Sequence, residues 1–151
     1  MATVIYPNDG VKRVESVFLG GTIDNGAEST MWQQQIIEAL SDVDIKLYNP
    51  RRLDWDSSWE NTENNPQFNQ QVSWELSCLE KSDLIVMYFA PNSISPISLL
   101  EFGLFYNKMI VCCPEGFWRK GNVDVVCRRY NIPKVNTLSE LVDEVLYRLK
   151  D

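Results

Sequence analysis

The sequence predicts an α/β fold in which helices cover both faces of a five-stranded, mostly parallel sheet. Segments typical of strands alternate along the chain with segments typical of helices, as in a doubly wound sheet. Residues 84–90 read LIVMYFA, and such an unbroken apolar run is expected of a central parallel strand that is buried on both faces. The 151 residues suit a single domain, with residues 1–12 as a loose N-terminal lead-in.

Turn and capping residues divide the chain into these elements. Pro66 is well placed to open a helix, and Thr137-x-x-Glu140 is a capping box for the last helix, whose apolar residues follow the 3.6-residue period. The expected strands are 14–20, 43–48, 84–90, 109–113 and 132–135. The expected helices are 31–40, with Ser29 or Thr30 as N-cap, and then 66–81, 97–107, 118–130 and 138–149.

This element order favours the flavodoxin-like strand order 2-1-3-4-5. In such sheets a ligand lies beyond the carboxyl ends of the strands, where the strand order reverses between the first and third strands. Three loops are therefore expected at the ligand site: residues 20–29, residues 91–96, and the polar loop 51–65 after the second strand. A loop as long as 51–65 is usually functional or folds over something.

Charge and apolar patterning exclude several classes of protein. The formal net charge is −7, so we expect neither nucleic acid nor an anionic membrane as the main partner, because both attract clustered Lys and Arg. No apolar run reaches the roughly 18 residues of a membrane span, and the N-terminus does not resemble a signal peptide. The four cysteines form no C-x-x-C pair, and we expect them to be reduced and buried in a cytoplasmic protein.

The chain contains no histidine. This absence rules out Ser-His-Asp and Cys-His catalysis and every metal site that uses histidine. The sequence shows no other metal-ligand cluster, so we expect neither a metal nor a cofactor. If the protein is an enzyme, its acid, base or nucleophile comes from Asp, Glu, Cys or Tyr, and carboxylates are the first candidates.

Glu101 is the leading candidate, because it falls in the first or second turn of the helix that follows the third strand. The helix N-terminus favours negative charge, so we expect an ionised carboxylate suited to attack an electrophilic carbon. The alternative is that Ser98-x-x-Glu101 is a capping box, in which Glu101 only satisfies backbone donors. Apolar neighbours expected to enclose Glu101 argue against that alternative, namely Leu99, Leu100, Phe102, Leu104 and Phe105.

Three further features belong to the candidate site. Glu75 lies in an apolar stretch of the preceding helix, where it orients a substrate hydroxyl, shifts the pKa of Glu101, or is only a solvated residue on the helix surface. The turn Gly20-Gly21-Thr22 either lets the backbone approach a ligand closely or is a plain glycine turn. Trp55 and Trp59 either stack on a flat heterocycle or belong to a surface lid.

Five segments follow one another in a recognisable order. They are VFLGGTID at 17–24, NPRRLDW at 49–55, FNQQVSWEL at 68–76, SDLIVMYF at 82–89 and SISPISLLEFGLF at 93–105. Together they resemble the nucleoside 2-deoxyribosyltransferase superfamily, and most closely its compact deoxyribosyltransferase-like branch. The resemblance is strongest at the E-x-G of Glu101 to Gly103.

The resemblance implies a flavodoxin-like sheet, a homo-oligomer, and an enzyme that acts on a small nucleoside or nucleotide without a cofactor. It implies that Glu101 attacks the anomeric carbon of a 2′-deoxynucleoside and displaces the base. A second base, or water in related hydrolases, then takes the sugar from the covalent ester. Glu75 would help to orient the sugar. Residues matching the opening strand and loop would bind near the base: Phe18, Gly20, Gly21 and Thr22.

The chain departs from the family at one position. Other members carry an aspartate shortly before the nucleophile, where this chain has Ser95, with Asn92 nearby. The acid for the departing base is therefore unassigned, and Asp54 or a group from a neighbouring subunit is a candidate. We place Asn92, Ser95, Asp54 and Trp55 among the substrate-binding residues. Two other functions stay open: a catalytically degenerate protein that binds a nucleotide-like ligand, and an NAD-cleaving enzyme.

Overall fold

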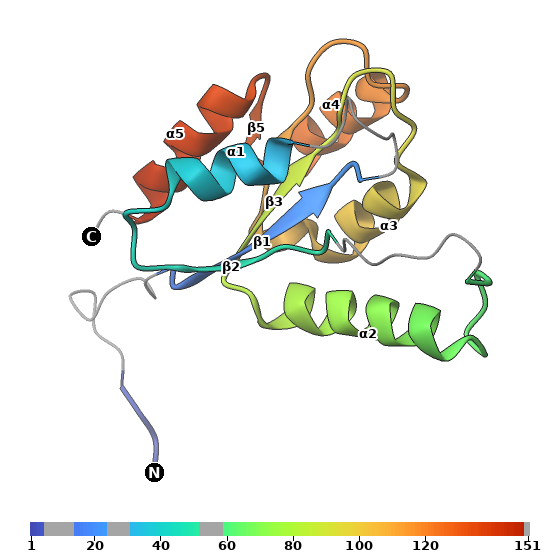
Figure 1. Cartoon of the computed structure of the whole chain (residues 1–151). Coiled ribbons are helices and arrows are strands. Elements are labelled where there is room, and N and C mark those ends of the chain that lie inside the picture. Colours follow the sequence, from blue (N-terminus) through green and yellow to red (C-terminus); the bar gives the residue numbers. More distant parts are fainter. Residues whose placement is uncertain (5–13, 24–30, 52–58, 150–151) are drawn as a thin grey trace.

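The computed structural model describes residues 1–4, 14–23, 31–51 and 59–149. Its five strands form one parallel sheet in the order β2-β1-β3-β4-β5, which confirms the predicted fold (Figure 1). The strands are β1 (Ser16–Gly21), β2 (Lys46–Tyr48), β3 (Leu84–Tyr88), β4 (Met109–Cys112) and β5 (Lys134–Val135).

Helices cover both faces of this sheet and enclose two apolar clusters (Figure 1). On one face lie α1 (Trp32–Ala39) and α5 (Leu138–Leu149), which bury Ile36 and Leu141. On the other face lie α2 (Pro66–Lys81), α3 (Pro96–Phe105) and α4 (Lys120–Arg129). A 3-10 turn, η2 (Tyr106–Lys108), joins α3 to β4. The sheet thus fixes the N-termini of the helices near the carboxyl ends of the strands.

Local capping sets the bounds of two helices as predicted. The Asn65 side chain accepts a hydrogen bond from the backbone N–H of Phe68 at 3.0 Å, and Pro66 occupies the first position of α2. At α5, the Thr137 hydroxyl accepts from the N–H of Glu140 at 3.1 Å. The Glu140 carboxylate in turn accepts from the N–H of Asn136 at 3.2 Å, which completes a capping box shifted by one residue.

The predicted cap of α1 is wrong. The N-cap is Met31, which makes no side-chain hydrogen bond, while Ser29 and Thr30 lie outside the described residues. A tertiary contact anchors the helix start instead, because the indole N–H of Trp32 donates to the Thr22 carbonyl at 2.8 Å. Trp32 is only 2% exposed. Burial of this large side chain therefore replaces the cap that the sequence suggested.

One expectation drawn from composition is confirmed by the structure. The four cysteines, Cys78, Cys112, Cys113 and Cys127, are buried free thiols, and burial raises the pKa of each. Such thiols are poor nucleophiles at neutral pH, because the thiolate is the reactive form. Among the described residues, no helix combines the length and the apolar character that a membrane span requires.

Candidate active site at the carboxyl ends of the strands

A buried cluster of three hydroxyls joins the ends of β1 and β3, where the strand order reverses. Thr22, Ser93 and Ser95 form this hydroxyl cluster, with Oγ1–Oγ distances of 2.7 Å from Thr22 to Ser95 and 3.2 Å from Thr22 to Ser93. The two serine hydroxyls lie 2.9 Å apart, and the Thr22 hydroxyl also accepts from the N–H of Ala90 at 2.9 Å. The cluster fixes the loop that leads into α3, so it positions everything that α3 carries.

The glycines of the predicted binding turn serve the packing of strands. Gly21 has a φ of 139°, and a Cβ there would lie 2.2 Å from the Tyr88 carbonyl oxygen. A Cβ on Gly20 would lie 3.0 Å from the Met87 side chain. Phe18, also predicted near a ligand, is 1% exposed and lies in the core beneath α2, α3 and α4. The three residues therefore pack β1 against its neighbours in this structure.

Glu101 lies in the second turn of α3, and its carboxyl group is not a cap. The helix begins at Pro96 with Ser95 as N-cap, so Ser98 stands inside the helix and the capping-box alternative is wrong. Ser95 has φ 38° and ψ 57°, a left-handed conformation held by the hydroxyl cluster. Glu101 is 8% exposed, and within the described part of the chain its carboxylate accepts no hydrogen bond.

Buried Glu101 and half-buried Glu75 form a pair of mutually repelling carboxyl groups. Burial raises the pKa of Glu101 to about 8, and the nearby charge of Glu75 contributes to this increase. Burial likewise raises the pKa of Glu75 to about 7, opposed by a hydrogen bond with the Gln71 side chain. The expectation that the helix N-terminus keeps Glu101 ionised is wrong, because the helix field fades beyond the first turn and burial dominates.

The apolar enclosure of Glu101 is one-sided. Phe102 is buried, and Leu99 and Phe105 pack partly buried against the same cluster. Leu100 and Leu104 were expected to enclose the carboxylate as well, but they are 60% and 58% exposed. The helical period of 3.6 residues turns them away from the sheet. Together with Ile97, which is 60% exposed, they form an exposed apolar row along α3.

Two of the remaining predicted binding residues, Asn92 and Ser95, lie in the loop that leads into α3. Asn92 is exposed with a φ of 62°, and its N–H donates to the Gly116 carbonyl at 3.0 Å, which ties the loop before α3 to the loop before α4. Ser95 belongs to the hydroxyl cluster, where its side chain is 3% exposed. Asp54 and Trp55 lie outside the described residues.

A pocket of about 260 Å³ lies between α2 and the residues that follow β2, and Glu75 is a neighbour of this pocket rather than part of its lining. The Gln71 amide connects the two, because it donates to the Pro50 carbonyl at 3.2 Å and also bonds to Glu75. Sequence reasoning missed this pocket, although the run of amide side chains before Glu75 was a usable signal. The pocket is lined by Asn49, Pro50, Arg51, Gln70, Gln71 and Trp74.

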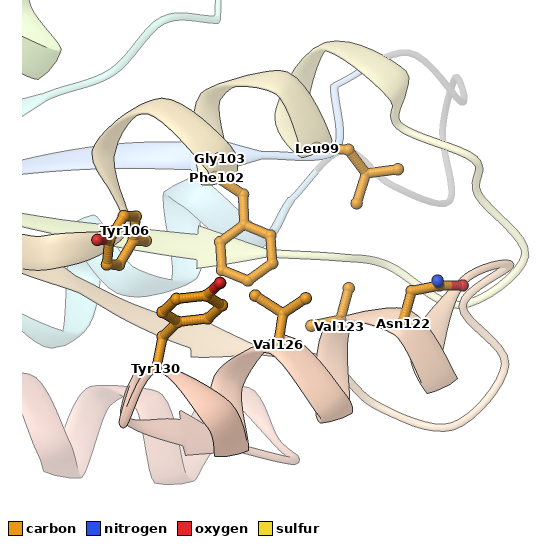
Figure 2. A pocket seen from close by; sticks show the side chains of 8 residues that line it. All are labelled: Leu99, Phe102, Gly103, Tyr106, Asn122, Val123, Val126 and Tyr130. Atoms are coloured by element: carbon orange, nitrogen blue, oxygen red, sulfur yellow. The ribbon is translucent and has the colours of Figure 1, made fainter.

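A larger groove of about 470 Å³ separates α3 from α4 (Figure 2). Figure 2 shows Tyr106 and Tyr130 at one end of the groove and Asn122 at the other. Gly103 lines it and lies about 160° around the helix from Glu101, at 100° per residue. Because Glu101 projects from the opposite side of α3, we place the candidate site at the carboxyl pair and not in this groove. The described residues also contain no group of three His, Cys, Asp or Glu side chains that could hold a metal ion.

The fold and the site define an α/β protein with a buried carboxylate at the carboxyl edge of a parallel sheet. The family model described as "Nucleoside 2-deoxyribosyltransferase like" matches residues 14–117. The chain belongs to this family. A comparison with curated protein sequences found no match.

Two solved structures share the fold at low sequence identity. A conserved protein from Enterococcus faecalis V583 is 15% identical, with a TM-score of 0.60 over 90% of this chain and 99% of that chain. A 2-deoxyribosyltransferase from Bacillus psychrosaccharolyticus is 12% identical, with a TM-score of 0.60 over 84% of this chain and 90% of that one. At these identities the similarity establishes the fold.

Proposed function

We propose that this protein cleaves the N-glycosidic bond of a deoxynucleoside or nucleotide, with Glu101 as nucleophile, and passes the sugar to another base or to water. The observation that carries the proposal is the buried, unbonded carboxyl group of Glu101 beside Glu75, at the edge of the sheet where ligands bind. Membership of the deoxyribosyltransferase-like family supports the same chemistry.

The proposed reaction is a double displacement. One oxygen of the ionised Glu101 carboxylate bonds to the anomeric carbon, and the bond from that carbon to the base nitrogen breaks, with its electron pair leaving on the base. The acceptor nitrogen of a second base, or a water oxygen, then attacks the same carbon, and the bond from this carbon to the Glu101 oxygen breaks. The proton that the acceptor loses passes to Glu75, the group proposed to have protonated the first base. Burial makes the carboxylate poorly solvated, so an electropositive anomeric carbon is a favourable partner for it.

Glu75 is the proposed source of the proton for the departing base. The serine that replaces the family's aspartate has a hydroxyl committed to Thr22 and Ser93, so Ser95 does not supply this acid. Burial holds the pKa of Glu75 at about 7, so the group is partly protonated at neutral pH. Two coupled carboxyls in such a range share one proton near neutral pH. Because the pKa of Glu101 is the higher of the two, the proton rests mainly on Glu101, and the proposed reaction proceeds from the minor form in which Glu75 holds the proton and Glu101 is ionised.

The test is an incubation of the purified protein with deoxynucleosides and deoxynucleotides, with and without a free acceptor base. Products are separated by chromatography. We expect base exchange or base release by the wild type and a loss of at least about 1000-fold in Glu101→Gln, as for removal of a nucleophile. Glu80→Gln, on the exposed side of α2, is the matched control and should retain full activity.

Each outcome has a distinct meaning. Exchange identifies a transferase, and free base without exchange identifies a hydrolase. Release of nicotinamide from NAD, with no action on deoxynucleosides, would replace the proposal by the NAD-cleaving alternative. Ligand binding with no turnover of any substrate would overturn the enzyme proposal in favour of the degenerate binding protein.

We also propose that the protein works as a homo-oligomer in the cytoplasm. The exposed apolar row of Ile97, Leu100 and Leu104 supports assembly, and the only ionisable side chain in α3 is the buried Glu101. Interface cores are depleted of charge, and stable interfaces bury roughly 800 Å² per subunit. Light scattering should show a dimer or larger species that Leu100→Lys dissociates. Tyr147→Lys, at an exposed position on α5, should leave the assembly intact.

A further inference from the structure

A pocket with a mixed aromatic and amide lining lies next to Glu75, the proposed acid. Its volume is about 260 Å³, and it lies between α2 and residues 49–51, which follow β2. Trp74 lines this pocket and immediately precedes Glu75 in the chain. At about 100° per residue along α2, Gln71 projects between the directions of Trp74 and Glu75. The pocket and the proposed acid are therefore separated by the Gln71 side chain.

Gln71 joins the pocket to the carboxyl pair of Glu75 and Glu101. Its Nε2 group donates to the Pro50 carbonyl at 3.2 Å, and its side chain is also hydrogen-bonded to Glu75. Gln71 is itself part of the pocket lining. These bonds hold its side chain at the border between the pocket and the carboxyl pair. A ligand that crosses this border presents one part to the pocket and another part to the two carboxyl groups.

Trp74 gives the pocket an exposed aromatic face. The residue is 41% exposed. Within the described part of the chain, no other aromatic ring packs against its indole, and no acceptor bonds to the indole N–H. A flat heterocycle stacked on this ring would cover its apolar face, and stacking of a nucleobase on an aromatic side chain is favourable for every base.

Two amide side chains, Asn49 and Gln70, supply polar groups to the same pocket. The Asn49 Oδ1 accepts from the backbone N–H of Arg51 at 3.0 Å, so its Nδ2 group is the end left for a ligand. Gln70 is exposed, and its side chain makes no hydrogen bond with the other described residues. The edges of nucleobases carry donors and acceptors that such amides recognise. The volume lies below the roughly 300–1,000 Å³ of pockets for drug-sized ligands, which favours a single ring system.

We propose that this pocket is the nucleobase subsite, with the base stacked on the Trp74 indole and the sugar extending past Gln71 to the carboxyl pair. Trp74 then holds the base, while Glu75 and Glu101 act on the bond to the sugar. The inference rests on the proposed function, which supplies a nucleoside or nucleotide as the ligand. It moves base binding away from Phe18 and Gly20, which serve the packing of β1 in this structure.

The experiment measures binding without turnover, in the full chain carrying Glu101→Gln. The probes are the common 2′-deoxynucleosides and their 5′-monophosphates, and 2-deoxyribose 5-phosphate is the matched probe that lacks a base. Isothermal titration calorimetry gives the affinities, and tryptophan fluorescence reports stacking on an indole. We expect at least one base-containing probe to bind and to quench the fluorescence, and we expect no such quenching by 2-deoxyribose 5-phosphate.

Two replacements of Trp74 separate its aromatic face from its fluorescence. Trp74→Phe keeps a ring, so the affinity should stay within about 3-fold while most of the quenching disappears. Trp74→Ala removes the ring and should weaken the base-containing probe by about 10- to 100-fold. Trp118→Ala, at another exposed tryptophan outside the pocket, is the matched control and should change neither the affinity nor the quenching. Circular dichroism establishes that each variant folds.

The outcomes separate this inference from the proposed function. An unchanged affinity in Trp74→Ala, or no binding of any base-containing probe, overturns the inference even if the wild type turns over nucleosides. Quenching by 2-deoxyribose 5-phosphate that Trp74→Phe abolishes would assign the pocket to the sugar phosphate and also overturn it. Base binding that depends on the Trp74 ring, in a protein whose wild type shows no turnover, supports the inference and refutes the proposed function.

Discussion

Replacement of Glu101 by glutamine should stabilise the protein at high pH while it removes activity. The pKa of Glu101 lies at about 8 in the folded protein, against an ordinary value of 4.5. Between these values the folded state binds more protons than the unfolded state, so wild-type stability falls as pH rises through this window. At about 1.4 kcal/mol per pKa unit, the buried charge costs roughly 3 kcal/mol at pH 7 and roughly 5 kcal/mol above pH 8.

The assay is urea unfolding of the wild type and Glu101→Gln, followed by tryptophan fluorescence at pH 5, 7 and 9. Near pH 5 both side chains are neutral in the folded state, so the two proteins should differ by less than about 1 kcal/mol. At pH 9 the variant should be more stable by about 3 kcal/mol or more. A stability difference that is the same at pH 5 and pH 9 would refute the reasoning. The exposed control Glu80→Gln should show no pH-dependent difference.

Further substitutions test the surroundings of the site. Glu75→Gln should lower the pKa of Glu101, because it removes a like charge, and carboxyl-carbon NMR would follow the titration; an unchanged midpoint contradicts the pairing. Thr22→Val should cost about 2–3 kcal/mol in chemical unfolding, since the N–H of Ala90 loses its acceptor, whereas exposed Thr62→Val should change stability by less than about 0.5 kcal/mol. Gly21→Ala should prevent folding, judged by solubility and circular dichroism, because its Cβ would overlap the Tyr88 backbone. Gly103→Ala, with open space at its Cβ, should instead raise the unfolding free energy by about 0.5–1 kcal/mol.

The bounds of an element were predictable where a local interaction sets them. Pro66 and the side-chain cap of Asn65 start α2 at the predicted residue, and the Thr137 capping box starts α5. The start of α1 was not predictable in the same way, because its anchor is a hydrogen bond from the Trp32 indole to the carbonyl of Thr22, the residue that follows β1. Short-range patterns carry no information about such contacts.

The charge state of the site shows the same limit. Position on a helix suggested an ionised Glu101, yet burial against the core and the charge of Glu75 raise its pKa to about 8. Both effects depend on how closely α3 packs against neighbouring elements, and the spacing of residues along the chain does not predict that packing. The exposure of Leu100 and Leu104 was not predicted for a related reason. A helix that is apolar on all sides does not reveal from its sequence which side packs against the sheet.

The sequence by itself determined the α/β class, the strand order and the candidacy of Glu101. These conclusions depend on the alternation of strand and helix patterns, on the apolar central strand and on the lack of histidine. All three are properties of the sequence and do not depend on how the chain folds. Only the tertiary structure decided which groups meet: the pairing of Glu101 with Glu75, the hydroxyl cluster of Thr22, and the contact of Gln33 with Arg51. These pairs join residues far apart in the chain, and their geometry and desolvation arise only when the sheet has formed.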